Sequence, residues 1–256
     1  MPLDTITIFT FFLVFVRCSG MMIAAPVFGA ANLPVMIRVF ITVALSMAMT
    51  FAVRPNVGAV PQDMGEFLLV VGNEALSGLL IGAFFSLVLH AVSMAGAIVD
   101  LQMGLGLSQV MNPVTGVPVS VIGQFKYMLG LMVFLQVDAH HLMLGAFLQS
   151  YQSLPTISTE IAGPIQESLV AMLGQMTLLA LQMAAPVAAV SIVVDAALGL
   201  VNRAVPQMQV FLVGMPAKTI MGMIALSISI PALVGTVQSG VEVVADGLTL
   251  AFREAP

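Results

Sequence analysis

Ionisable side chains are rare in this chain, and several stand inside long apolar segments. Only 7% of its 256 residues are charged, whereas 60% are hydrophobic. A charge at the centre of a bilayer costs about 2.5–3.5 kcal/mol on insertion scales, so it normally faces protein or water and marks a functional or structural contact. We therefore select the following residues as candidate structural charges inside the membrane: Arg17, Arg38, Glu74, Asp100, Asp195 and Arg203.

The depth of each charge in the bilayer decides whether it needs a partner inside the protein. Arg17 lies in the middle of its apolar segment, so we expect a buried partner. Arg38 lies near the start of its segment, where its long side chain can instead reach an interface. Asp100 and Asp195 each need a base or several hydrogen-bond donors, because an unpaired charge at depth costs several kcal/mol. The alternative for Asp195 is a carboxylate that lines water.

The polar residues do not have the spacing of a catalytic or metal site. Ser108, in Gly-Leu-Ser-Gln, lacks the second glycine of a nucleophile elbow, and the sequence has no His-Glu-x-x-His. His140 and His141 are adjacent, so they point about 100° apart on a regular helix and do not form the i,i+4 pair that chelates a metal. His90 has no cysteine or second histidine at ligand spacing, which is typical of a hydrogen-bonded core residue. With the single cysteine, Cys18, inside an apolar segment, we expect no enzyme, no cofactor and no metal site.

Composition places the chain in the membrane. A soluble domain carries about 25% charged residues, far above the 7% found here. The length allows about five or six spanning helices of roughly 20 apolar residues each. No basic patch indicates nucleic-acid binding, and no basic n-region precedes the first segment, which we expect to remain in the mature protein. The sequence therefore predicts an all-α integral membrane protein.

The elements that must position these charges follow from the apolar runs. We expect a helical hairpin first, then a very long third helix, a fourth helix with a short amphipathic helix after it, and a final hairpin kinked at Pro186 and Pro231. The third segment would extend about 50 Å, beyond a hydrocarbon core of about 30 Å, so it must tilt, break or leave the bilayer. Gly78 and Gly82 form a GxxxG pair, which permits close helix approach. The predicted segments are 6–28, 33–53, 67–99, 119–137, 138–150, 165–201 and 217–252.

The stretch from Gly96 to Pro118 is rich in glycine yet never becomes charged. Non-helical backbone at membrane depth is tolerated only against protein or beside a water-filled cavity. We expect a central loop at 104–118 whose glycines supply flexibility and whose apolar side chains seal a pore by dewetting. The alternative is a turn at the membrane interface. The candidate gating residues are Gly104, Leu105, Gly106, Leu107, Val110, Met111 and Gly116.

Two functions fit these features before any resemblance is considered. A proton- or ion-coupled secondary transporter would use proline-broken helices and intramembrane charges at a midplane site between repeats. Against it, the two broken helices are consecutive and no second half of matching length follows. A non-catalytic channel subunit, closed by Met- and Gly-rich loops, is the other interpretation.

Several motifs, in order along nearly the whole chain, resemble the FliR family of flagellar export-gate subunits, called SctT in virulence injectisomes. The chain has Asn112-Pro113 where that family has Asp-Pro. The motifs that carry the resemblance are Phe15–Gly20, Ala25–Gly29, Ile37-Arg38, Gly96–Gln102, Asn112-Pro113, His141 with Ser150 and Pro155, Pro186, Asp195, Leu198-Gly199, Arg203, Pro206–Phe211 and Gly214–Pro216.

The resemblance implies a subunit of the flagellar type III export gate, a closed channel through which unfolded flagellar proteins are secreted. It implies a FliP-like part over residues 1–164 and a FliQ-like C-terminal hairpin over 165–256, packed in a helical hetero-oligomer. The implied partners are FliP-type, FliQ-type, FlhB-type and FlhA-type subunits, unfolded export substrates and membrane lipid, with no nucleic acid. The implied location is the bacterial inner membrane at the flagellar basal body, crossed several times.

Overall fold

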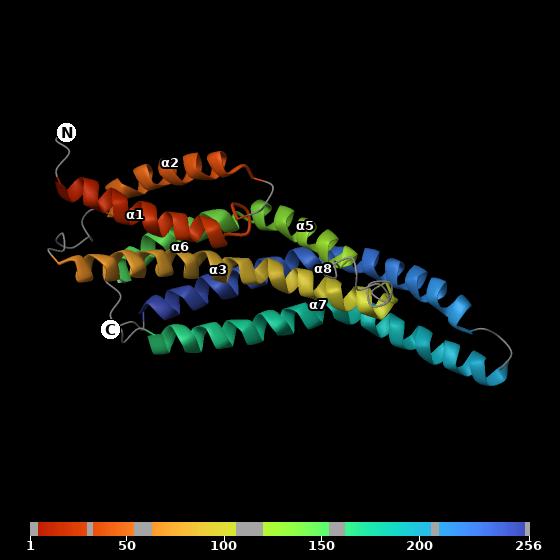
Figure 1. Cartoon of the computed structure of the whole chain (residues 1–256). Coiled ribbons are helices and arrows are strands. Elements are labelled where there is room, and N and C mark those ends of the chain that lie inside the picture. The colour runs from red at the N-terminus through yellow and green to blue at the C-terminus, as the bar shows by residue number, and fades with distance from the viewer. Residues whose placement is uncertain are drawn as a thin grey trace. The chain divides into compact units, whose positions relative to one another are not determined.

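The computed structural model describes residues 5–29, 33–53, 63–105, 120–153, 162–205 and 210–253 (Figure 1). Every secondary-structure element in these ranges is an α-helix, which confirms the predicted all-α membrane class. The helices are α1 (Thr5–Ala24), α2 (Val35–Val53), α3 (Met64–Met103), α5 (Val121–Gln136), α6 (Ala139–Ser153), α7 (Ala162–Ala204) and α8 (Val210–Arg253).

Helix lengths agree with several membrane crossings. In the described ranges, 5 helices are long and apolar enough to span a membrane, or up to 6 if α5 and α6, bent by 66°, form one broken span. Helices α3, α7 and α8 contain 40, 43 and 44 residues. At 1.5 Å per residue they extend about 60–66 Å, roughly twice a hydrocarbon core of about 30 Å. The expectation of overlong helices is therefore confirmed.

The final hairpin differs from the prediction in one respect. Helix α8 begins at Val210 instead of residue 217, so Pro216 lies inside it together with Pro231. A proline inside a helix removes one backbone hydrogen bond, and the apolar residues on both sides of Pro216 continue the helix. The predicted connection from residue 202 to residue 216 is correspondingly shorter.

Backbone contacts divide the chain into two compact units, which we describe separately. Unit 1 combines residues up to Val88 with Leu135–Leu173 and the chain from Val241 onward. Unit 2 combines Leu89–Phe134 with Gly174–Gly240. Helices α3, α7 and α8 contribute to both units.

In unit 1, α1 and α2 pack side by side as the predicted hairpin (Figure 1). The buried face of α2 consists mainly of small polar residues, Thr42, Ser46 and Thr50. Each hydroxyl donates to the carbonyl four residues earlier, at 2.8, 2.7 and 2.6 Å. The outward face is apolar, with Phe40 and Phe51 69% and 65% exposed. Small residues inward and large apolar residues outward are typical of a helix that packs inside lipid.

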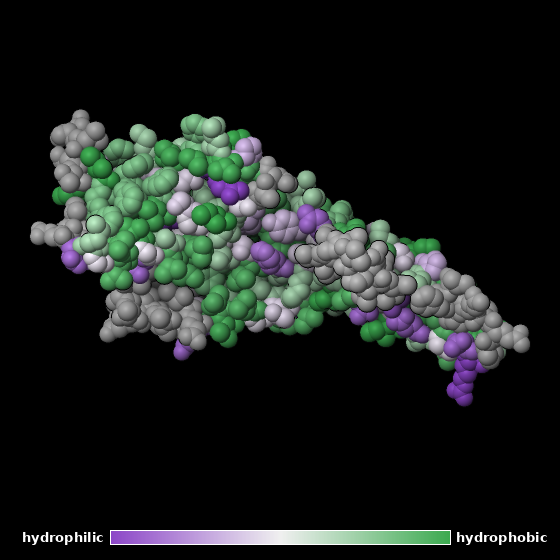
Figure 2. Space-filling view, viewed as in Figure 1, coloured by the Kyte–Doolittle hydropathy of each residue, from purple (hydrophilic) through white to green (hydrophobic). Residues whose placement is uncertain are grey.

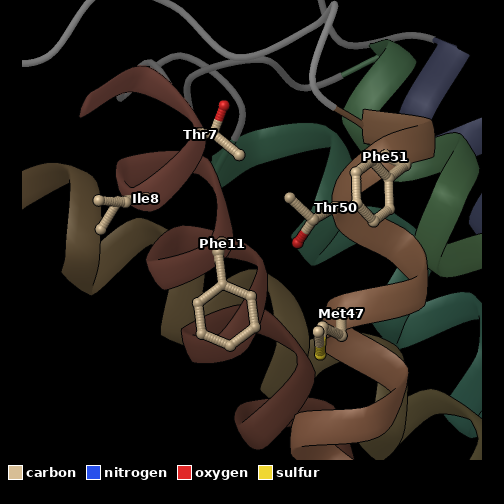
Figure 3. A pocket seen from close by; sticks show the side chains of 6 residues that line it. All are labelled: Thr7, Ile8, Phe11, Met47, Thr50 and Phe51. Carbon is tan, nitrogen blue, oxygen red and sulfur yellow. The ribbon is translucent and has the colours of Figure 1, made fainter. Parts of the chain in front are cut away.

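A cavity of about 240 Å³ remains between α1 and α2 (Figure 3). Its lining is apolar apart from two threonines, and it comes from only these two helices. The lining residues are Thr7, Ile8, Phe11, Met47, Thr50 and Phe51.

Unit 2 has its own apolar core, to which the end of α3, the start of α5 and the middle parts of α7 and α8 contribute. Many large apolar side chains remain exposed, and hydrophobic residues dominate the face shown in Figure 2. An apolar exterior over long helices fits contact with lipid or with other membrane subunits. The core residues are Val99, Met103, Ile122, Ala184, Val187, Ala225 and Leu226.

Candidate functional site

Glycines bring α1 and α3 into backbone contact in unit 1. A Cβ atom added at Gly20 would lie 2.6 Å from the Ala75 carbonyl oxygen. One added at Gly78 would overlap the Arg17 carbonyl oxygen, and one at Gly82 would overlap that of Met21. The predicted GxxxG pair thus allows a close helix crossing, as its pattern indicated.

One turn from this crossing, Arg17 forms a buried ion pair with Glu74. The Arg17 Nε and Nη2 groups donate to the two Glu74 carboxylate oxygens at 2.6 and 3.0 Å. The side chains are only 1% and 6% exposed. This bidentate geometry is the strongest arrangement for an arginine and a carboxylate. The buried partner expected for Arg17 is therefore present.

Helix α6 completes this cluster with Ser150 and Tyr151, which the pattern of charges did not predict as partners of Arg17. Arg17 Nη1 donates to Ser150 Oγ at 2.8 Å, and the Tyr151 hydroxyl donates to Glu74 Oε2 at 2.8 Å. The Arg17 guanidinium carbon also lies 3.6 Å from the centroid of the Tyr151 ring. Each carboxylate oxygen and each guanidinium nitrogen has a partner, so the cluster holds α1, α3 and α6 together.

Asp100 organises a second cluster, in unit 2, where α3 ends and α5 begins. Its side chain is buried and accepts hydrogen bonds from the Ser120 hydroxyl and from the Ile122 backbone N–H, the latter at 3.2 Å. Ser120 Oγ in turn accepts from the Gly123 N–H at 2.8 Å. These bonds satisfy free amides at the start of α5, where the helix dipole also favours a negative charge. Asp100 is thus held by donors and not by a base.

The Asp100 backbone also terminates α3. Its carbonyl accepts from the Leu105 N–H at 3.0 Å, while Gly104 N–H donates to the Leu101 carbonyl at 3.2 Å. Gly104 has φ 78°. This is a Schellman ending, which needs a left-handed residue after the helix and therefore favours glycine. One residue, Asp100, consequently anchors both the last turn of α3 and the first turn of α5.

Close packing reinforces this junction. A Cβ atom at Gly96 of α3 would lie 2.6 Å from the Gly123 nitrogen and 2.7 Å from the Ile122 carbonyl oxygen of α5. The two helices therefore touch backbone to backbone just before Asp100. The stems on either side of residues 106–119 are held next to each other by packing as well as by hydrogen bonds.

Lys126 is a buried cation that sequence reasoning left without a role. Its side-chain nitrogen donates to the Met183 carbonyl of α7 at 3.3 Å. Met183 lies three residues before Pro186, whereas the carbonyl that loses its helical donor to the proline is that of Gln182. Lys126 therefore links α5 to the backbone of α7 within unit 2, in addition to the helical bonds of α7.

The remaining predicted charges are more exposed. Asp195 pairs with Lys218 of α8 at 2.7 Å, so the base that we expected it to need is present, although its side chain is 54% exposed. This exposure was not predicted, because a single acid does not indicate which face of a helix packs inward. Arg38 is half-buried and Arg203 is exposed.

Of the predicted gating residues, the described ranges contain Gly104 and Leu105. Gly104 ends α3 as stated above, and Leu105 is 36% exposed. The others lie outside the described residues: Gly106, Leu107, Val110, Met111 and Gly116.

Comparison with known proteins assigns the chain to a family. The model of the family "Bacterial export proteins, family 1" matches residues 8–243. Flagellar biosynthetic protein FliR of Bacillus subtilis (strain 168) is 36% identical over 223 residues, which cover 84% of this chain and 84% of that protein. FliR of Caulobacter vibrioides is 32% identical over 88% of this chain and 90% of that protein. FliR of Aquifex aeolicus is 28% identical over 90% of this chain and 88% of that protein. The chain therefore belongs to the family of bacterial export proteins that includes the flagellar biosynthetic protein FliR.

Proposed function

We propose that this chain is a gate subunit of the flagellar type III protein export apparatus and forms part of the closed channel for unfolded flagellar proteins. Family membership makes it a component of the flagellar export apparatus. The finer role as part of a closed channel is supported by the way the structure anchors the central loop. The secondary-transporter alternative is not favoured, because Glu74 and Asp100 are occupied by protein partners.

The observation that carries this proposal is the junction at Asp100. Its carbonyl ends α3 and its carboxylate caps α5, so the chain leaves and re-enters the helices at one fixed point. The proposed gate would move aside while its stems, at Gly104 and Ser120, stay fixed by these hydrogen bonds. Its apolar residues can exclude water when the gate is closed, as hydrophobic constrictions do in channels.

The proposed partners follow from the resemblance and the exposed surface. FliP-type and FliQ-type subunits would pack on the apolar helix faces, with FlhB-type and FlhA-type subunits nearby. Residues 1–164 would pack as a FliP-type subunit does and residues 165–256 as a FliQ-type subunit does. The complex would lie in the bacterial inner membrane at the flagellar basal body. Support comes from the large apolar side chains left exposed on α7 and α8, among them Ile192, Val193, Leu200 and Ile228.

Two variants of the central loop test the seal. The first deletes residues 108–116 and keeps Asp100, Leu105 and Ser120; the second replaces the same residues with a Gly-Ser segment of equal length. We expect both variants to assemble with their partners and to lower the membrane potential of cells that overproduce the complex. The Gly-Ser variant keeps the length of the loop and removes its apolar side chains, so it tests the effect of those side chains alone. If both variants assemble and the membrane potential stays as high as with the unmodified complex, the seal belongs to neighbouring subunits.

A further inference from the structure

We propose that Asp138, His140 and His141 bind a divalent transition-metal ion of the Zn²⁺ class at the bend between α5 and α6. The three residues lie where α5 ends at Gln136 and α6 begins at Ala139. One ligand atom from each of them lies within 4.8 Å of the others. This proposal is independent of the export function.

The distances suit a metal ion of tetrahedral preference. Zn–N and Zn–O bonds of about 2.0–2.2 Å place neighbouring ligand atoms about 3.3–3.6 Å apart. Asp138 Oδ1 and His141 Nδ1 are already 3.3 Å apart, and both side chains are 69% exposed. The third ligand, from the half-buried His140, lies within 4.8 Å of the other two, so it needs a movement of at most about 1.5 Å, which a side-chain rotation can supply. Two imidazoles with one carboxylate suit Zn²⁺, Cu²⁺ or Ni²⁺ and not Mg²⁺ or Ca²⁺.

The local backbone explains why the sequence analysis predicted that His140 and His141 do not bind one metal ion. Adjacent histidines point about 100° apart on a regular helix, and that estimate considered only their Cβ directions. Here the His140 and His141 ring centroids lie 4.2 Å apart. Asp138 has φ 55°, a left-handed conformation that brings its side chain back to the first turn of α6.

A second observation concerns His140 alone. Its Nδ1 atom is buried and has no hydrogen-bond partner among the described residues. Buried polar atoms normally have a partner, and an orphan atom calls for a bound ion or water. A metal ion beside the imidazole, or a water bound to it, would satisfy this atom.

The simpler interpretation is an i,i+3 ion pair between Asp138 and His141. That pair does not involve His140, so the contribution of His140 separates the two interpretations. The positive end of the α6 dipole opposes a cation here, and only three ligands are available. We therefore expect weaker binding than at a closed four-ligand structural zinc site. Gln136, Asp138 and His141 are exposed at the bend, so an ion can reach two of the three ligands from outside the helices.

The experiment is a calorimetric titration of Zn²⁺ into the purified complex, prepared with a tag that contains no histidine and stripped with a chelator. We expect one ion per chain, with affinity about tenfold or more weaker in each of Asp138→Asn, His140→Ala and His141→Ala. The matched controls are Asp246→Asn and His90→Ala, exposed residues of the same two types on other helices; the core position expected for His90 was wrong. Their affinity should equal that of the unmodified complex.

Three results would overturn the proposal. They are the absence of saturable binding to the unmodified complex, an unchanged affinity in His140→Ala, and an equal loss in the two control variants. The first of these needs no substitution, so it stands even if a variant fails to assemble.

Discussion

Replacing Arg17 with leucine isolates the energy of the buried cluster between α1, α3 and α6. The substitution removes both bonds from the guanidinium to Glu74 and leaves a carboxylate that is 5% exposed with the Tyr151 hydroxyl as its remaining donor. Breaking one side of a buried ion pair costs about 3–5 kcal/mol. That corresponds to a loss of about 150- to 4,000-fold in the ratio of folded to unfolded chain, since about 1.4 kcal/mol is a factor of ten.

Removing the remaining partners should reverse most of this loss. Arg17→Leu with Glu74→Leu leaves no buried charge, and replacing a whole buried pair with apolar residues is often neutral or stabilising. The Tyr151 hydroxyl then lacks its acceptor, which costs about 1–3 kcal/mol. Adding Tyr151→Phe removes that cost. We therefore expect stability to rise from the single variant to the double and again to the triple variant.

The assay heats the detergent-solubilised complex carrying a fluorescent tag on this chain and follows the monodisperse fraction by size-exclusion chromatography. Glu167→Gln, at an exposed carboxylate on α7, serves as the matched control and should leave the midpoint temperature unchanged. An Arg17→Leu complex as stable as the unmodified one would refute the reasoning. So would a double variant no more stable than the single one, because the penalty would then not be an unpaired charge.

Three further predictions follow from the same structure. Gly78→Ala should destabilise the complex because its Cβ would overlap the Arg17 carbonyl, whereas Gly72→Ala, with nothing within 4 Å, should be neutral or stabilising; equal midpoint temperatures would contradict the close crossing. Asp195→Leu should reduce assembly and motility more than Glu242→Leu does, because it leaves Lys218 unpaired; equal effects would show that Asp195 merely meets water. The chain should co-purify with FliP-type and FliQ-type subunits, and a folded, monodisperse monomer recovered without them would count against the gate.

The number and approximate bounds of the helices could be predicted because uninterrupted apolar length is a strong signal in membrane proteins. The start of α8 was misplaced because Pro216 was taken as a boundary, although the apolar run continues through it. The resemblance gave the family, which the comparisons confirm. These features depend on local sequence or on ordered motifs, and neither needs knowledge of which helices touch.

The partners of the charges could be predicted only in part. The need of Arg17 for a buried partner follows from its depth, but the identity of that partner does not. Glu74 is 57 residues away along the chain, and Tyr151 is 77 residues beyond Glu74. Such contacts depend on which faces of α3 and α6 meet. The same ignorance of helix faces made Asp195 seem buried.

The two buried acids illustrate two ways of holding a charge inside a membrane. Glu74 is neutralised by an arginine, which fixes three helices but needs a cation of matching depth. Asp100 is stabilised by a backbone N–H, a serine hydroxyl and the dipole of α5, and these hydrogen bonds involve no cation. The second arrangement needs only neutral donors from the start of a neighbouring helix, whereas the first needs a cation that another helix brings to the same depth. The stem of the proposed gate is therefore held, among the described residues, by hydrogen bonds to Asp100 and not by an ion pair.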